Sequence, residues 1–135
     1  MRRNEFLLDT HIIIWSILGD KRVNSKIESI MYNPSNTIYY SVASMWEVQI
    51  KYGIKKMPIS GREFMHYCEQ SGYHKLPVDD MHIIELGNLQ REEGAIPHND
   101  PFDRILLSQA KAEGFSFVTH DPLFRAYNEN CVVEV

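Results

Sequence analysis

Short apolar runs alternate with longer amphipathic segments along this chain, and this pattern predicts strands that alternate with helices. The predicted strands are rich in apolar, β-branched or aromatic residues and cover 5–8, 37–40, 73–76, 115–118 and 131–135. The predicted helices cover 11–18, 25–32, 45–52, 62–70, 81–92, 101–113 and 123–127. Several of these helices end beside a glycine, as at Gly19 and Gly114, which is a common stop signal.

Strands that alternate with helices favour βαβ units and an α/β fold with a central, mainly parallel sheet. The runs 6–8 and 115–118 are almost entirely apolar, which is typical of strands that helices cover on both faces. In open parallel sheets, ligands bind beyond the carboxyl ends of the strands. The residues that follow the predicted strands are therefore the first candidates for function.

The composition indicates a folded protein with a single domain over residues 1–135, because 44% of the residues are hydrophobic and 24% are charged. The longest apolar run, 12–15, is too short for a transmembrane helix, so no membrane association is expected. The basic start with Arg2 and Arg3 lacks the apolar stretch of a signal peptide. The cysteines Cys68 and Cys131 do not form a disulfide framework and favour a reducing cytoplasm.

Acidic residues stand where strands end or helices begin, and they form the candidate metal site: Asp9, Glu47, Asp103 and Asp121. Asp9 follows the first strand, and Asp121 follows the strand 115–118. Glu47 and Asp103 are expected in the first turns of the helices that contain them. Carboxylate oxygens without cysteine suit a hard cation such as Mg²⁺ or Mn²⁺, which lowers the pKa of a bound water and can bind a phosphodiester.

Helix capping is the structural alternative for each of these carboxylates. Ser44 and Glu47 form a capping-box pattern, in which Ser44 is the N-cap. Asp9 and Asp121 also precede predicted helices. All of these caps would nevertheless fall at one end of the sheet, and a residue can serve a helix start and a metal site together.

Asp100 and Asp103 divide these two roles between them. Asp100 precedes Pro101 and is the expected N-cap, whose side chain folds back onto its own helix. Asp103, three residues later, is free to project. We therefore assign Asp103 to the metal and Asp100 to the cap or to an outer contact of the site.

Several polar residues next to the carboxylates are candidates for a supporting role. The hydroxyl groups of Thr10, Ser41 and Thr119 could orient a carboxylate or a water, or could simply satisfy the backbone at a turn. Arg104 could order the start of its helix by pairing with a carboxylate such as Asp100, or could contact a phosphate.

Other residues have plainer interpretations. His98 and His120 flank the acidic segments, where a solvated surface position is favoured over contact with a nucleic acid. Lys51, Lys55 and Lys56 suit either a solvated helix end or the backbone of a nucleic acid. Large residues at helical spacing are expected in the core, namely Trp15, Met45, Trp46 and Ile50.

The net charge of −4, from 14 basic and 18 acidic residues, disfavours a protein that coats nucleic acid. Without the candidate metal ligands, 14 acidic residues balance 14 basic ones, so the remaining surface is neutral. A bound divalent cation would make the site itself positive. The charge balance therefore still allows a phosphate substrate at the metal.

Four segments resemble, in order and spacing, the motifs of PIN-domain nucleases of the VapC type, the toxins of bacterial toxin–antitoxin pairs. The segments are LLDTH at 7–11, SVASMWEV at 41–48, HNDPFDRILLSQA at 98–110 and FVTHDPLF at 117–124. The resemblance spans essentially the whole chain. It implies a three-layer α/β/α sandwich, a homodimer and a cognate antitoxin protein.

The same resemblance implies an endoribonuclease that depends on Mg²⁺ or Mn²⁺ and hydrolyses RNA phosphodiesters with metal-activated water. It matches the catalytic and metal-binding carboxylates of the family to Asp9, Glu47, Asp103 and Asp121. One alternative is a non-catalytic binding or assembly module with the same fold. A phosphoacceptor domain that binds Mg²⁺ is a weaker alternative, because Asp9 has no acidic neighbour in sequence after the first strand.

Overall fold

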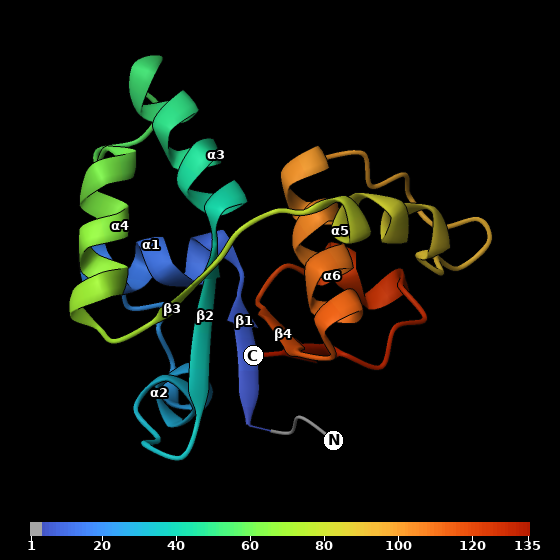
Figure 1. Ribbon diagram of the computed structural model, residues 1–135, viewed down its shortest axis with the longest axis horizontal. Helices are drawn as coiled ribbons and strands as arrows, with labels where there is room; N and C mark the ends of the chain where they lie inside the picture. Colours follow the sequence, from blue (N-terminus) through green and yellow to red (C-terminus); the bar gives the residue numbers. More distant parts are fainter. Residues whose placement is uncertain (1–3) are drawn as a thin grey trace.

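The computed structural model describes residues 4–135, so the basic start of the chain lies outside the described residues. Within them, five strands form one sheet in the order β3-β2-β1-β4-β5 (Figure 1). The strands are β1 (Glu5–Leu8), β2 (Thr37–Ser41), β3 (His74–Leu76), β4 (Ser116–Thr119) and β5 (Val132–Glu134). Every neighbouring pair is parallel, which confirms the predicted α/β fold with a parallel sheet.

The segments between the strands are helical, as the alternating pattern predicts. The α-helices are α1 (Thr10–Leu18), α2 (Ser25–Met31), α3 (Val42–Gly53), α4 (Gly61–Gln70), α5 (Asp80–Glu85) and α6 (Pro101–Glu113). Two short 3₁₀ helices, η1 (Leu86–Asn88) and η2 (Pro122–Ala126), complete the described part of the chain. Among residues 4–135, no helix combines the length and the apolarity that crossing a membrane requires.

Apolar side chains cover both faces of the sheet. Leu7 and Leu8 are adjacent in β1 and therefore point to opposite faces, yet both are fully buried. Leu8 belongs to the core under α1, α2 and α4, whereas Leu7 packs with Leu106 and Leu107 of α6. Figure 1 shows α1 and α4 on one side of the sheet and α5 and α6 on the other. These layers confirm the three-layer sandwich.

The predicted helix 81–92 is wrong beyond its first turns. Helix α5 ends at Glu85, η1 follows, and Leu89 is already extended. The backbone then pairs with the end of η2 and the residues that follow it, because Glu92 N–H donates to the carbonyl of Ala126 and Asn128 N–H donates to that of Gln90. Long-range pairing therefore overrides the local helical pattern. The predicted helix 123–127 is likewise a 3₁₀ turn that starts at Pro122.

Helix α3 begins earlier than its sequence pattern predicts. Ser41, the last residue of β2, is the N-cap, and its hydroxyl accepts a hydrogen bond from Ala43 N–H at 3.0 Å. Ser44 is therefore inside the helix, and Glu47 lies in the second turn rather than the first. The expected capping box at Ser44 is wrong because an equally good cap stands three residues upstream.

The core prediction for large helical residues holds in part. Trp15 is buried and Met45 packs against the core under α4. Trp46 and Ile50, however, are 63% and 43% exposed, so their placement in the core is wrong. Both lie on a solvent-exposed face of α3.

The order of the strands determines where a site can form. The chain adds β2 and β3 on one side of β1, and then β4 and β5 on the other. The sheet therefore has its topological switch point between β1 and β4, where crevices form beyond the carboxyl ends of the strands. Asp9 follows β1, and Asp121 lies two residues after β4.

Candidate metal centre

Asp9 is buried at the end of β1, with one carboxylate oxygen held and the other free. Its Oδ2 accepts a hydrogen bond from the hydroxyl of Thr119 at 2.7 Å. Its Oδ1 is buried and has no hydrogen-bond partner among the described residues. Although Asp9 is the N-cap residue of α1, its side chain makes no capping hydrogen bond. The carboxylate is thus directed into the site rather than onto the helix.

Burial raises the pKa of Asp9 from 3.8 to about 7, because a carboxylate removed from water is less stable when charged. The hydrogen bond from Thr119 opposes this rise, whereas the negative charges of Asp103 and Asp121 add to it. These electrostatic effects show that the three carboxylates lie close enough to repel one another. A cation at this position would relieve the repulsion.

Glu47 has the same combination of one held oxygen and one free oxygen. Its buried side chain accepts a hydrogen bond at Oε2 from the ammonium group of Lys51, with a distance of 2.8 Å between the two atoms. Its Oε1 is buried and has no partner among residues 4–135. One turn of α3 separates the two residues, so the helix itself sets this ion pair.

Asp103 is held from the side by a buried histidine. Its Oδ2 lies 3.0 Å from Nε2 of His98, and Nδ1 of His98 lies 2.9 Å from the hydroxyl of Tyr127. Since a carboxylate accepts, Nε2 of His98 donates to Asp103, and Nδ1 is the ring nitrogen in contact with the hydroxyl of Tyr127. The expectation that His98 is a solvated surface residue is therefore wrong, whereas His120 is exposed as expected.

The pKa of Asp103 is also raised. Burial is the largest cause, and the carboxylates of Asp100 and Glu47 contribute in the same direction, while the hydrogen bond to His98 lowers the pKa. The ligand atoms of His98, Asp103 and Asp121 all lie within 4.8 Å of one another. Asp103 and Asp121 are therefore close enough to share a single cation, whereas both ring nitrogens of His98 already have partners. Asp9 and Glu47 are not part of this compact group.

Asp121 and Asp100 both serve helix starts. Asp121 Oδ1 accepts from Leu123 N–H at 2.9 Å, and its own N–H donates to the hydroxyl of Thr119. Asp100 Oδ1 accepts from the N–H groups of Phe102 and Asp103 at 2.9 and 3.1 Å, so the predicted N-cap is confirmed. Asp103 is left free to project toward the site.

The supporting candidates have different contacts. Thr119 touches both sides of the site, since its hydroxyl donates to Asp9 and accepts from Asp121 N–H. The hydroxyl of Thr10 donates to that of Ser44, and the hydroxyl of Ser41 donates to Gln109. The side chain of Arg104 has no hydrogen-bond or ion-pair partner within residues 4–135, so the expected pair with Asp100 does not form.

Three residues were not predicted to support the carboxylates of the site: His98, Lys51 and Tyr127. The spacing of four between Glu47 and Lys51 on a helix is a signal that could have found this pair. His98 and Tyr127 are 29 positions apart, and no local pattern connects them.

The arrangement suits a hard cation. Among residues 4–135, one buried oxygen of Asp9 and one of Glu47 lack a partner, and a buried polar atom without a partner is costly unless something else binds it. The nearby carboxylates of Asp103 and Asp121 add further oxygen donors. Oxygen ligands of this kind fit Mg²⁺ or Mn²⁺.

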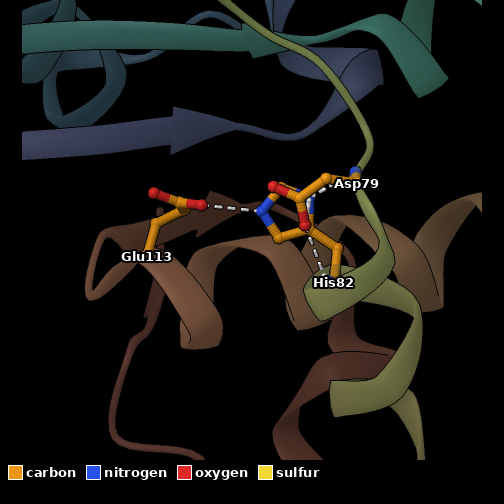
Figure 2. Close-up of side chains that lie close together, drawn as sticks. All are labelled: Asp79, His82 and Glu113. Atoms are coloured by element: carbon orange, nitrogen blue, oxygen red, sulfur yellow. Dashed lines mark hydrogen bonds and ion pairs between the residues drawn. The ribbon is translucent and has the colours of Figure 1, made fainter.

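A second group of possible ligand atoms lies between α5 and α6, at Asp79, His82 and Glu113 (Figure 2). Nδ1 of the buried His82 accepts from Asp79 N–H at 3.1 Å, and its Nε2 lies 2.8 Å from Glu113 Oε2. Ser108 on α6 donates to the carbonyl oxygen of His82. The ring nitrogens of His82 contact Asp79 at the start of α5 and Glu113 at the end of α6, so this group joins the two helices.

Fold and site together define a class of protein: an α/β protein with a parallel sheet and converging carboxylates beyond the ends of its strands. The family model described as PIN domain matches residues 6–130. The chain therefore belongs to the PIN-domain family. A search of curated proteins finds no match.

Solved structures share the fold over nearly the whole chain. One is the crystal structure of VapBC2 from Rickettsia felis bound to a DNA fragment from their promoter, with a TM-score of 0.68 and 21% identity over 97% of this chain and 98% of the matched chain. Another is DNA-bound VapBC from Salmonella typhimurium, with a TM-score of 0.68 and 20% identity over 96% and 97% of the two chains.

Proposed function

We propose that this protein is an endoribonuclease that depends on Mg²⁺ or Mn²⁺. The observation that carries the proposal is a buried oxygen on each of Asp9 and Glu47 that has no partner in the described part of the chain, near the carboxylates of Asp103 and Asp121. A binding module has no need to bury carboxylates that repel one another. Membership of the PIN-domain family supports the same conclusion.

In this proposal Asp9, Glu47, Asp103 and Asp121 hold the cation. When bound, the ion would act as a Lewis acid that activates a water and stabilises the leaving oxygen of the phosphodiester. The products of this hydrolysis would be a 5′-phosphate and a 3′-hydroxyl. The chain keeps these ligands in place, since Thr119 fixes Asp9. His98 and Lys51 do the same for Asp103 and Glu47.

The proposed binding partner is based on the similar solved structures. Because the solved neighbours are VapBC complexes, we infer a cytoplasmic toxin that a cognate antitoxin protein inhibits. A hollow of about 740 Å³ along α4 offers Ile17, Ile59 and Met65 to an apolar peptide segment. This hollow is the position at which we expect the antitoxin to bind.

A homodimer is the expected oligomeric state. Trp46 and Ile50 of α3 and its C-cap residue Ile54, here called the α3 strip, are spaced four residues apart and are 63%, 43% and 58% exposed. Residues at this spacing share one helix face. Apolar side chains gathered on one exposed face are typical of a protein interface.

Cleavage of an end-labelled pool of structured RNA tests the activity. We expect cleavage at defined sites with Mn²⁺, none with EDTA, and loss of activity in Asp9→Asn. Cleavage that persists in Asp9→Asn would refute this site. If the protein binds Mn²⁺ but no RNA in the pool is cut, the non-catalytic module becomes the better description.

A further inference from the structure

A pocket of about 330 Å³ adjoins the candidate metal centre. Asp9 and Asp121 form part of its wall, and the other principal lining residues are His11, Trp15, Arg22 and His120. A volume of this size is at the lower end of the range for small-molecule sites, so it suits one nucleotide rather than a longer segment. The protein thus has a separate hollow directly beside the carboxylates.

Aromatic rings form one part of this pocket. Trp15 is only 9% exposed, so it acts as the floor. The ring of His120 meets it edge-on, with 5.4 Å between the ring centroids, and the ring of His11 lies 6.3 Å away. Both histidines are exposed residues. Their imidazoles therefore border the solvent-exposed side of the pocket, with Nδ1 of His120 in contact with the carbonyl oxygen of Val135.

A positive charge forms another part. The guanidinium of Arg22 lies over the Trp15 ring, 4.5 Å from its centroid. Its Nε and Nη2 bind the carboxylate of Asp20 at 3.1 and 2.7 Å. These contacts fix the group in place and leave Nη1 without a partner within residues 4–135. Arg22 can therefore present one donor to an anion without moving.

We propose that the pocket formed by His11, Trp15, Arg22 and His120 binds one nucleotide of the RNA strand, adjacent to the phosphodiester at the metal centre. Its base lies against the imidazoles and its phosphate reaches Arg22. This inference rests on the proposed function. Aromatic surfaces that stack bases, with a cation beside them, are the usual means of holding single-stranded nucleic acid.

The two tryptophans of the chain provide a direct test, because Trp46→Phe leaves Trp15 as the sole tryptophan. In this background, Trp15 fluorescence is titrated in Mg²⁺ with adenosine 5′-monophosphate and with ribose 5-phosphate, neither of which can be cleaved. We expect saturable binding of the nucleotide, with an affinity about tenfold higher than that of the sugar phosphate, because only the nucleotide has a base to stack.

Substitutions then locate the ligand. His11→Ala, His120→Ala and Arg22→Gln should each weaken nucleotide binding about five- to tenfold. His74→Ala, which removes an exposed histidine on β3, is the matched control and should leave the affinity unchanged. Thermal unfolding of each variant shows whether it is folded, and calorimetric titration confirms affinities that do not depend on the fluorescence of Trp15.

The two proposals can fail separately. Equal affinities for the nucleotide and the sugar phosphate, or affinities that His11→Ala and His120→Ala leave unchanged, would overturn the nucleotide pocket even if RNA is cut. Absence of saturable binding in the folded protein would do the same. Nucleotide binding without any metal-dependent cleavage would instead refute the nuclease and retain the pocket.

Discussion

At the scale of single residues, the chemistry of this protein depends on oxygens that burial leaves without partners. Asp9 and Glu47 each have one oxygen that a neighbour holds and one that nothing holds among the described residues. The held oxygen fixes the geometry of the side chain, and the free one is left for a ligand. Such a carboxylate weakens the fold and prepares the site at the same time.

The raised pKa of Asp9 predicts that ionisation of this residue destabilises the protein when EDTA removes metals. Its folded-state pKa of about 7 exceeds the unfolded value of 3.8, so the unfolded state loses its proton at lower pH. The contribution of Asp9 to the free energy of unfolding therefore falls as pH rises from about 4 to 7, by at most about 4 kcal/mol.

Asp9→Asn removes this effect because the amide group does not ionise. Its oxygen can still accept from Thr119, while its N–H₂ faces the other carboxylates. Urea unfolding in EDTA at pH 5 and pH 8 measures it. The variant should gain clearly more stability relative to wild type at pH 8 than at pH 5. The same difference between the two proteins at both pH values would contradict the raised pKa.

With metal bound, wild type should be more stable than Asp9→Asn, which is the reverse of the order expected in EDTA at pH 8. Mn²⁺ at a hundredfold excess over its Kd should stabilise wild type by about 2.7 kcal/mol, because it binds only the folded site. Asp9→Asn and Glu47→Gln should lose most of this gain in thermal unfolding. Glu113→Gln, which alters the group between α5 and α6, is the matched control and should keep it. Loss of the gain in Glu113→Gln alone would place the metal elsewhere.

At the scale of elements, the group formed by Asp79, His82 and Glu113 fastens α5 to α6. Helix α5 has only six residues, too few to be stable without tertiary contacts. Its buried histidine receives Asp79 N–H and reaches Glu113 at the last position of α6. The side chain of His82 therefore links the start of α5 to the end of α6.

His82→Ala should lower the free energy of unfolding by about 2–4 kcal/mol, because it leaves a cavity and removes the partner of Glu113. Urea unfolding of this variant checks the value, with the exposed His74→Ala as control. Below the unfolding transition, RNA cleavage should persist, since the group does not contact the metal centre. A change under about 0.5 kcal/mol would show that α5 is held by its apolar contacts instead.

At the scale of the whole molecule, exposed apolar faces are the places where we expect further chains to bind. The α3 strip is solvated in the single chain, and Trp46 also meets the ring of Phe102 on α6, with 5.2 Å between the centroids. The strip therefore continues onto a second helix. A surface of this kind favours association between copies of the protein.

Ile50→Glu should convert the expected dimer to a monomer, because a charge in an apolar interface has no partner there. Analytical ultracentrifugation should show a dimer Kd at least about tenfold higher than that of wild type. Leu18→Glu adds the same charge at an exposed position of α1 and should leave the Kd unchanged. A monomeric wild type, or a dimer that Ile50→Glu leaves intact, would show that the α3 strip is not the interface.

The sequence by itself determined those features that depend on neighbouring residues. Apolar runs predicted the strands β1, β2 and β4 to within a residue, and Asp100 before Pro101 predicted the cap and start of α6. Strand ends also placed Asp9 and Asp121 at one edge of the sheet. Each of these features follows from local periodicity or from a cap that bonds only two or three residues away.

Tertiary structure decided the features that depend on contacts between distant segments. Backbone pairing with the end of η2 and the residues after it stops the predicted helix 81–92 at Glu85. A hydrogen bond with Tyr127 holds His98 in the interior beside Asp103. One oxygen each of Asp9 and Glu47 is buried without a partner among the described residues because the packing of helices against the sheet removes it from water. Burial and pairing between remote positions follow from the order of strands in the sheet, which no short stretch of sequence records.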